Sequence, residues 1–406
     1  MTTENSSGSS RALARLCLAG LILASTAFAE EWNTSLDGAL YGYASHTTPR
    51  ADSLLNPGNQ LARIPQNSST VEARFNFKAE QENLRFTARP IVLHQNNSLN
   101  NQKDAFLSLW QLRLRAEDSW SIAAGREVLN WGPAQFRSPS SPFYFDNGRS
   151  NPMRELSGVD ALKVSWNPDM QRTLTIAHLT GSGHLAQDLW RNSDLLKADQ
   201  RGDDWAGGLA LAQTPGQGIF ASVHGQYSAT DALLMYGEAA SSTRVNSLQS
   251  PADPNLPYSI LPRSARQTVM LAGIAWTFDN GQSLNAEYLH DGHGYSPAEQ
   301  TAYYRRASAS PLNTSMALQF APPLLGRDYL HLVWQSNLME SGGYWRMMAT
   351  HSFTDHGNEL SGYSEFSLNR QVTVFMLGAL PAGGTQQEFS SLLRYSVTAG
   401  IKVALP

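Results

Sequence analysis

The feature of this chain that most limits its possible folds is an alternation of apolar and polar residues with a period of two. From Val71 to Glu80, every odd position is apolar and every even position is charged or polar. The same alternation returns in further segments, at 84–89, 110–116, 162–166, 219–227 and 345–349. Because successive side chains of a β-strand point to opposite faces, this period predicts two-faced strands along almost the whole chain.

The C-terminal segment 393–405 carries the alternation over its full length. Its residues Thr398, Gly400, Val403 and Leu405 follow a polar-x-Gly-x-x-apolar-x-apolar pattern, which resembles the last strand of outer-membrane barrels. In such barrels the insertion machinery reads this strand, so the resemblance implies that machinery as a partner. The chain departs from the pattern at Pro406, where a terminal aromatic residue is commonest.

The predicted connections are short at one end of the sheet and long at the other. Tight turns fall at 81–82, 117–118, 167–169 and 279–282, and long connections at 44–68, 127–157, 182–202, 244–266 and 292–327. This asymmetry is typical of bacterial outer-membrane barrels. Aromatic residues near the predicted strand ends fit the girdles of such barrels: Trp110, Trp120, Trp166, Trp205, Tyr227, Trp276, Tyr288, Trp334 and Tyr344.

These patterns predict an all-β fold, namely a transmembrane antiparallel outer-membrane β-barrel with long extracellular loops and short periplasmic turns. A direct count gives 17 strands. Both termini of such a barrel are periplasmic, so the number of strands is even. We expect about 18 strands, and about 16 is the alternative. The uncounted strand lies between about residues 180 and 231, and the best helical pattern, at 184–198, lies in the same region. A soluble sandwich, propeller or β-helix is the alternative, although no repeat of 20–50 residues supports the last two.

The first 29 residues are organised like a cleaved signal peptide, which leaves 30–406 as one barrel domain. Arg11 and Arg15 precede the apolar run 16–24, and Ala27-Phe28-Ala29 forms a cleavage site. The run is too short to span a bilayer as a helix. We therefore expect export to the cell outer membrane, with its lipids and lipopolysaccharide as partners. The formal net charge of −4 makes nucleic acid an implausible partner.

If the apolar residues face lipid, the alternate residues line the lumen. Among them are seven arginines: Arg74, Arg85, Arg89, Arg113, Arg115, Arg346 and Arg394. Lys78 and Lys402 add to this set, and Glu72, Glu80, Glu287 and Glu365 are the counter-charges. A basic lumen favours anionic or carboxylated solutes, which guanidinium groups bind in forked pairs. The alternative is that the arginines pair with the glutamates and only fill the lumen.

The connection 127–157 is a candidate constriction loop. Four prolines exclude regular structure from it, and long ordered loops of this kind are usually functional. Counted from the N-terminus, it is the third outside loop. Folded inward, it would narrow the pore and offer the aromatic and charged groups that sugar-binding surfaces use; folded outward, it would be a lid. Its candidate residues are Trp131, Arg137, Tyr144, Asp146, Asn147, Arg149, Arg154 and Glu155.

The same loop carries a family resemblance. Gly125, Trp131-Gly132-Pro133, Asn147-Gly148-Arg149 and Asn151-Pro152 resemble the signature of capsule-assembly (Wzi-like) outer-membrane proteins, which is Trp-Trp-Gly-Pro followed by Ser-x-Asn-Ala-Arg-Pro. Asn130 stands in place of the first tryptophan, and the second motif is interrupted. Other porin-like families share a Gly-Arg…Trp-Gly…Asn-Pro pattern. The capsule-assembly resemblance implies an 18-stranded barrel that binds or retains surface polysaccharide.

Three functions follow from these features. The first is the handling of extracellular or capsular polysaccharide, by export or surface attachment, with an anionic polysaccharide as the partner. The second is a porin for small anionic solutes. The third, an outer-membrane hydrolase around His178, Ser182 and His184, lacks a G-x-S-x-G motif. We expect no enzyme activity, no cofactor and no metal site, since the histidines lack metal-ligand spacing.

Overall fold

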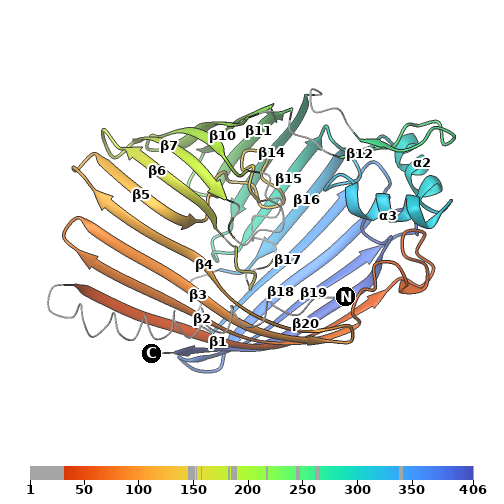
Figure 1. Ribbon diagram of the computed structural model, residues 1–406, viewed down its shortest axis with the longest axis horizontal. Helices are drawn as coiled ribbons and strands as arrows, with labels where there is room; N and C mark the ends of the chain where they lie inside the picture. The colour runs from red at the N-terminus through yellow and green to blue at the C-terminus, as the bar shows by residue number, and fades with distance from the viewer. Residues whose placement is uncertain are drawn as a thin grey trace, which may run out of the picture.

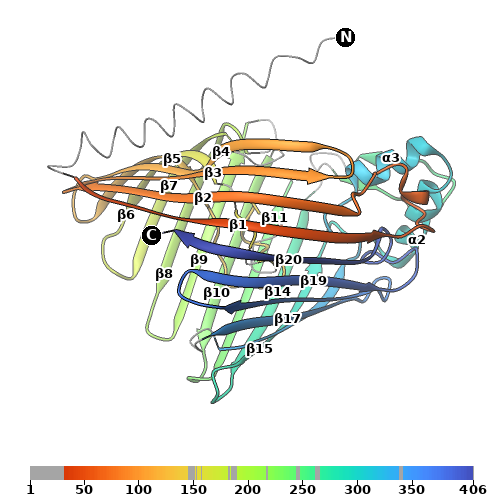
Figure 2. The ribbon, with the colours of Figure 1, turned by 90° about the horizontal axis from the view of Figure 1, so that it is seen from below.

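The computed structural model describes residues 32–405, apart from 145–150, 152, 157, 182, 184–189, 216–217, 244–246, 261–265 and 338–341. The signal-peptide prediction and Pro406 lie outside the described residues. One antiparallel sheet of 18 strands makes up most of the fold. It closes into a barrel because β1 (Asn33–Pro49) pairs with β2 (Asn67–Gln81) on one side and β20 (Leu393–Leu405) on the other (Figure 2). The predicted fold class and strand number are confirmed.

The remaining barrel strands follow in chain order, each paired antiparallel with its neighbours. They are β3 (Leu84–Asn97), β4 (Asn101–Arg115), β5 (Trp120–Glu127), β6 (Val159–Trp166), β7 (Arg172–Gly181), β8 (Ser193–Arg201), β9 (Trp205–Thr214), β10 (Gly218–Ser228), β11 (Leu233–Ser242), β14 (Gln267–Thr277), β15 (Ser283–Asp291), β16 (Asp328–Gln335), β17 (Gly343–Ser352), β18 (Asn358–Ser367) and β19 (Val372–Ala382).

The uncounted strand is β8, at 193–201, within the region where the sequence count failed. The helix expected at 184–198 is therefore wrong over 193–198, and the connection expected at 182–202 is wrong over 193–201. Leu195 faces inward and is 2% exposed, whereas Leu196 faces outward and is 41% exposed. Both faces of this strand are apolar at that point, because Leu195 packs on side chains inside the barrel. Because the inward residue is apolar as well, the segment lacks the alternation of apolar and polar residues by which a strand is recognised in a sequence.

The two rims of the barrel differ in the length of their connections. At one rim every connection is a short turn, and β1 begins and β20 ends there (Figure 2). At the other rim lie the long connections, with the helices η1 (Pro57–Asn59), α2 (Pro297–Ala307) and α3 (Pro311–Phe320) and the hairpin of β12 (Leu248–Gln249) with β13 (Ser259–Ile260) (Figure 1). Among the described residues, no helix has the length and apolarity needed to cross a bilayer.

The outward faces of the two rims also differ in chemistry. At the short-turn rim, the predicted aromatic girdle holds for six residues that are 38–52% exposed: Trp120, Trp166, Trp205, Tyr227, Trp276 and Trp334. Of the other three predicted residues, Tyr344 faces the lumen and donates to Gln335, Tyr288 lies at the opposite rim, and Trp110 lies inside β4. The outward face of the long-loop rim instead carries histidines on five strands: His46, His94, His178, His290 and His351.

Candidate functional site

We call the connection between β5 and β6, residues 128–158, L3; its described residues reach across the lumen of the barrel. It contacts Glu238 on β11 and Arg74 on β2. These two strands lie on opposite sides of the ring, because eight strands separate them in either direction. Figure 1 shows the loop inside the barrel. The expectation that this segment folds inward is therefore confirmed, and it is the third connection at the long-loop rim counted from the N-terminus.

Glu287 on β15 fixes one part of L3. Its carboxylate is 1% exposed and accepts hydrogen bonds from the backbone N–H groups of Gln135, at 2.6 Å, and Phe136, at 2.8 Å. The hydroxyl of Tyr236 donates a third, at 2.7 Å. A buried carboxylate is tolerated only when its oxygens are satisfied in this way. Glu287 therefore acts as an anchor for L3, a role that its expected function as a counter-charge did not include.

Glu238 on β11 fixes the neighbouring part of the loop. It accepts from the N–H groups of Ala134 and Ser140, at 2.8 and 3.0 Å, and from the hydroxyls of Ser138 and Ser140, at 2.6 and 2.7 Å. Gly132 approaches so closely that a Cβ at this position would lie 2.4 Å from Glu238 Oε1, and its φ is +87°. Only glycine fits both conditions. We call the inward face of β11 and β15, with these two carboxylates, the clamp wall.

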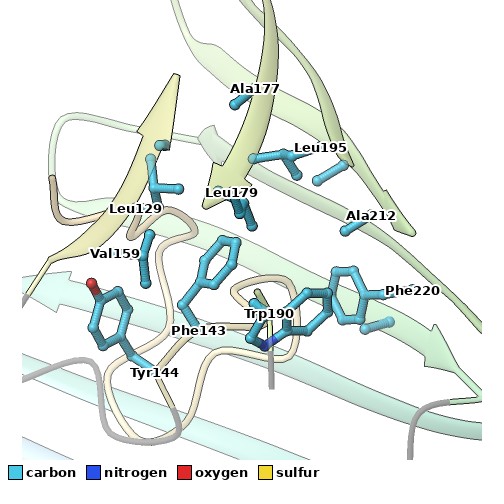
Figure 3. Packing of buried hydrophobic residues seen from close by; sticks show 13 residues of the cluster. Leu129, Phe143, Tyr144, Val159, Ala177, Leu179, Trp190, Leu195, Ala212 and Phe220 are labelled. Carbon is cyan, nitrogen blue, oxygen red and sulfur yellow. The ribbon is translucent and has the colours of Figure 1, made fainter. Parts of the chain in front are cut away.

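Aromatic side chains of L3 fill the lumen beside the clamp wall. Phe143 and Tyr144 lie among inward residues of β6 to β11, such as Leu179 and Leu195 (Figure 3). Trp190 packs edge-on against Phe143, with ring centroids 5.3 Å apart. The indole N–H of Trp131 donates to the carbonyl of Ser140 at 2.8 Å, and its ring contacts Phe143. Two of the loop residues expected to contact ligand, Trp131 and Tyr144, thus pack inside the protein.

Five of the predicted lumen arginines lie on the inward face of β2, β3 and β4, which we call the basic wall. They are Arg74, Arg85, Arg89, Arg113 and Arg115. The register places Arg85 opposite Glu80 on β2 and Arg113 on β4. With Lys78, the wall has six cationic side chains against three carboxylates on the same strands: Glu72, Glu80 and Asp104.

Ion pairing neutralises only part of the basic wall. Glu80 lies 2.9 Å from Arg85 Nε and 2.7 Å from Lys78 Nζ, and these side chains are a third or more exposed. Among the described residues, no carboxylate forms an ion pair with Arg113 or Arg115; Arg113 donates weakly to the Ser121 hydroxyl at 3.4 Å. The part of the wall nearer the short turns therefore keeps an excess of positive charge.

The central part of the basic wall meets L3. Glu155 of the loop lies 2.8 Å from Arg89 Nη1 and 3.5 Å from Arg74 Nη1. Arg74 also donates to the carbonyl of Met153 at 2.8 Å, and its guanidinium is held by Glu72 through contacts of 2.8 and 3.1 Å. These contacts attach L3 to the basic wall, on the side of the barrel opposite the clamp wall.

The other predicted site residues have different positions. Arg346 on β17 is 5% exposed and donates to the side-chain oxygen of Gln135 at 3.1 Å, so it supports L3. Arg394 lies at the long-loop rim, 3.7 Å from Asp52, and is 59% exposed. The guanidinium of Arg137 lies over the ring of Phe136.

Seven more predicted residues remain, four in the later part of L3 and three belonging to the third function. The N–H of Arg154 donates to the carbonyl of Asn151 in a turn of L3. Asp146, Asn147 and Arg149 lie outside the described residues. Of the hydrolase candidates, His178 faces outward and pairs with Asp194 at 2.8 Å, and Ser182 and His184 lie outside the described residues.

A further carboxylate, on a half-buried residue, lies among the loops above the lumen. Glu388, in the connection between β19 and β20, accepts hydrogen bonds from the N–H of Leu325 at 3.0 Å and from the Tyr329 hydroxyl. Burial, together with the nearby carboxylate of Asp355, raises the pKa of Glu388 to about 7. Among the described residues, no group of three His, Cys, Asp or Glu side chains could hold a metal ion.

The barrel is similar in fold to outer-membrane porins of known structure. OccK5 (OpdH) of Pseudomonas aeruginosa aligns with a TM-score of 0.57 and 8% sequence identity, over 92% of this chain and 99% of that chain. OccK11 (OpdR) of the same organism aligns with a TM-score of 0.54 and 12% identity, over 92% and 96%. No protein-family model and no curated protein matches the sequence. The resemblance to capsule-assembly proteins therefore stays an interpretation of the loop motif.

Proposed function

We propose that this chain is a non-enzymatic channel of the outer membrane through which small anionic solutes, carboxylates in particular, diffuse. The observation that carries the proposal is the basic wall, with six cationic side chains against three carboxylates. A lumen lined by one sign of charge raises the local concentration of the opposite ion. The guanidinium fork also matches the two oxygens of a carboxylate. L3 narrows the lumen, so that solutes pass close to this wall.

The test is single-channel recording of the refolded barrel in a planar bilayer under a salt gradient. We expect stable conductance steps and a reversal potential of the sign that anion preference gives. The triple variant R85Q/R113Q/R115Q should move this potential towards that of an unselective pore, because it removes half of the cations of the basic wall. R394Q is the matched control, since Arg394 lies at the rim beside Asp52. Cation preference in the unmodified protein would overturn the proposal.

Polysaccharide export or attachment is the second candidate. Its support is the loop motif together with the crossing of the lumen by L3, which suits a closed barrel. Against it stands the packing of two aromatic residues of L3: Tyr144 is 4% exposed, and Trp131 is partly buried against the same cluster. The same recording separates the two functions. A barrel that inserts and stays closed, and that retains an anionic polysaccharide on a column, would favour this second function.

A further inference from the structure

We propose that the central part of the basic wall is a carboxylate-binding site and that Glu155 of L3 occupies it in place of the solute. The inference rests on the proposed function and adds to it where the solute binds and what competes for that place. In this view Glu155 is a tethered competitor, and a passing carboxylate exchanges with it.

The donors around Glu155 come from three neighbouring strands. Arg89 of β3 lies 2.8 Å from Oε1, and the hydroxyl of Ser108 of β4 lies 3.3 Å from the same oxygen. Arg74 of β2 lies 3.5 Å from Oε2. Two guanidinium groups and one hydroxyl around a single carboxylate form the kind of site that binds a carboxylated ligand. The Glu155 side chain is 17% exposed.

The wall holds these donors in place without help from Glu155. Glu72 binds the Arg74 guanidinium through both of its oxygens, and the ring of Tyr41 lies 4.3 Å below it. Arg89 donates from Nε to the Asn76 side chain at 2.6 Å. The site would therefore keep its shape after Glu155 leaves, and a preorganised site loses less free energy on binding.

Glu155 can leave the wall in this proposal without breaking a strand ladder, because it does not belong to a β-strand. It belongs to L3, and its neighbour Met153 is held by the Arg74 guanidinium and the Tyr363 hydroxyl. If the carboxylate left, two guanidinium groups would face Glu72 alone, which favours entry of another anion. A solute carboxylate supplies that anion. Because a tethered group acts at a local concentration in the millimolar range, it weakens binding of the free competitor.

The experiment measures how succinate, a small dicarboxylate, reduces the chloride current through single channels. E155Q keeps the size of the side chain and removes its charge. We expect the half-blocking concentration of succinate to fall by about tenfold, because the tethered competitor no longer carries its charge. E155D, whose carboxylate is one methylene further from Arg89, should lie between E155Q and the unmodified protein.

Two further variants make the result decisive. E80Q removes a carboxylate that belongs to the same wall but not to L3, so it should change ion preference and leave the half-blocking concentration nearly unaltered. In the double variant E155Q/R89Q, the half-blocking concentration of succinate should return towards that of the unmodified protein. If E155Q and E80Q change the half-blocking concentration of succinate equally, Glu155 acts only as one more charge of the wall. The inference is then wrong, and the proposed anion channel is unaffected. If the unmodified barrel prefers cations, the proposed function fails as well.

Discussion

The two walls that L3 joins hold the loop by opposite chemistry. On the clamp wall, the barrel supplies the carboxylates, Glu238 and Glu287, and the loop supplies backbone N–H and hydroxyl donors. On the basic wall, the loop supplies the carboxylate, Glu155, and the barrel supplies guanidinium groups. Both contacts involve carboxylates, yet they differ in burial and in what could replace them.

The difference decides which contact is fixed and which is exchangeable. Glu287 is 1% exposed, and no dissolved molecule can reach its donors without opening the loop. Removing one partner of such a buried set leaves the others unsatisfied, at a cost of about 1–3 kcal/mol for each. The Arg89 side chain is 37% exposed, and pairs that contact water contribute little. The clamp wall therefore sets the position of L3, and the basic wall is where the loop competes with solutes.

The largest effect should come from E287A, which removes the acceptor of two backbone N–H groups of L3 and of the Tyr236 hydroxyl. We expect L3 to leave its position, giving a larger and noisier single-channel conductance. The barrel should survive, because the backbone ladders of β14, β15 and β16 do not use this side chain. The matched control is E80A on β2, whose carboxylate pairs with Lys78 and Arg85 of the basic wall. An unchanged conductance in E287A would show that the clamp does not position the loop.

A smaller effect should follow from G132A, which tests the same clamp from the loop side. The added methyl group would lie 2.4 Å from Glu238 Oε1 at a φ of +87°, and such strain costs on the order of 1–3 kcal/mol. We expect faster protease cleavage of L3 and noisier channels. G225A on β10 is the control, because the nearest atom to its Cβ is 3.7 Å away. Equal cleavage rates in the two variants would contradict the close fit of Gly132.

The smallest effect concerns Glu388, a half-buried residue that belongs to neither wall. Its pKa is raised from 4.5 to about 7, so the folded loops bind a proton more tightly than the unfolded chain does. The contribution of Glu388 to stability is therefore greatest below about pH 4.5 and is lost as the pH rises through about 7. We expect protease to cleave the connection 383–392 faster at pH 7.5 than at pH 5.5 when the rates are corrected with a reference peptide. E388Q should remove this difference, and its persistence in E388Q would assign it to another group.

The sequence predicted the barrel well because alternation is a local property. Each two-residue repeat reports which side chains face lipid and which face the lumen, so the inward position of Arg74, Arg85, Arg89, Arg113 and Arg115 could be predicted. The one strand that escaped, β8, is apolar on both faces because its inward Leu195 packs on side chains inside the barrel. Glu238 could have been noticed as a lone carboxylate in the otherwise uncharged β11, and its register with β14 gives it an inward position.

What the sequence by itself determined is the strand pattern, the third loop and the arginine-bearing inward face of β2, β3 and β4. Only the tertiary structure decided what L3 does there. The partners of Glu155 lie on β2, β3 and β4. The L3 partners of Glu287 are also distant in sequence, with a separation of 151 residues between Phe136 and Glu287. Loop residues have no periodic sequence pattern from which such contacts could be predicted. Their positions follow from closure of the ring, which places β2 and β11 opposite each other and within reach of one loop.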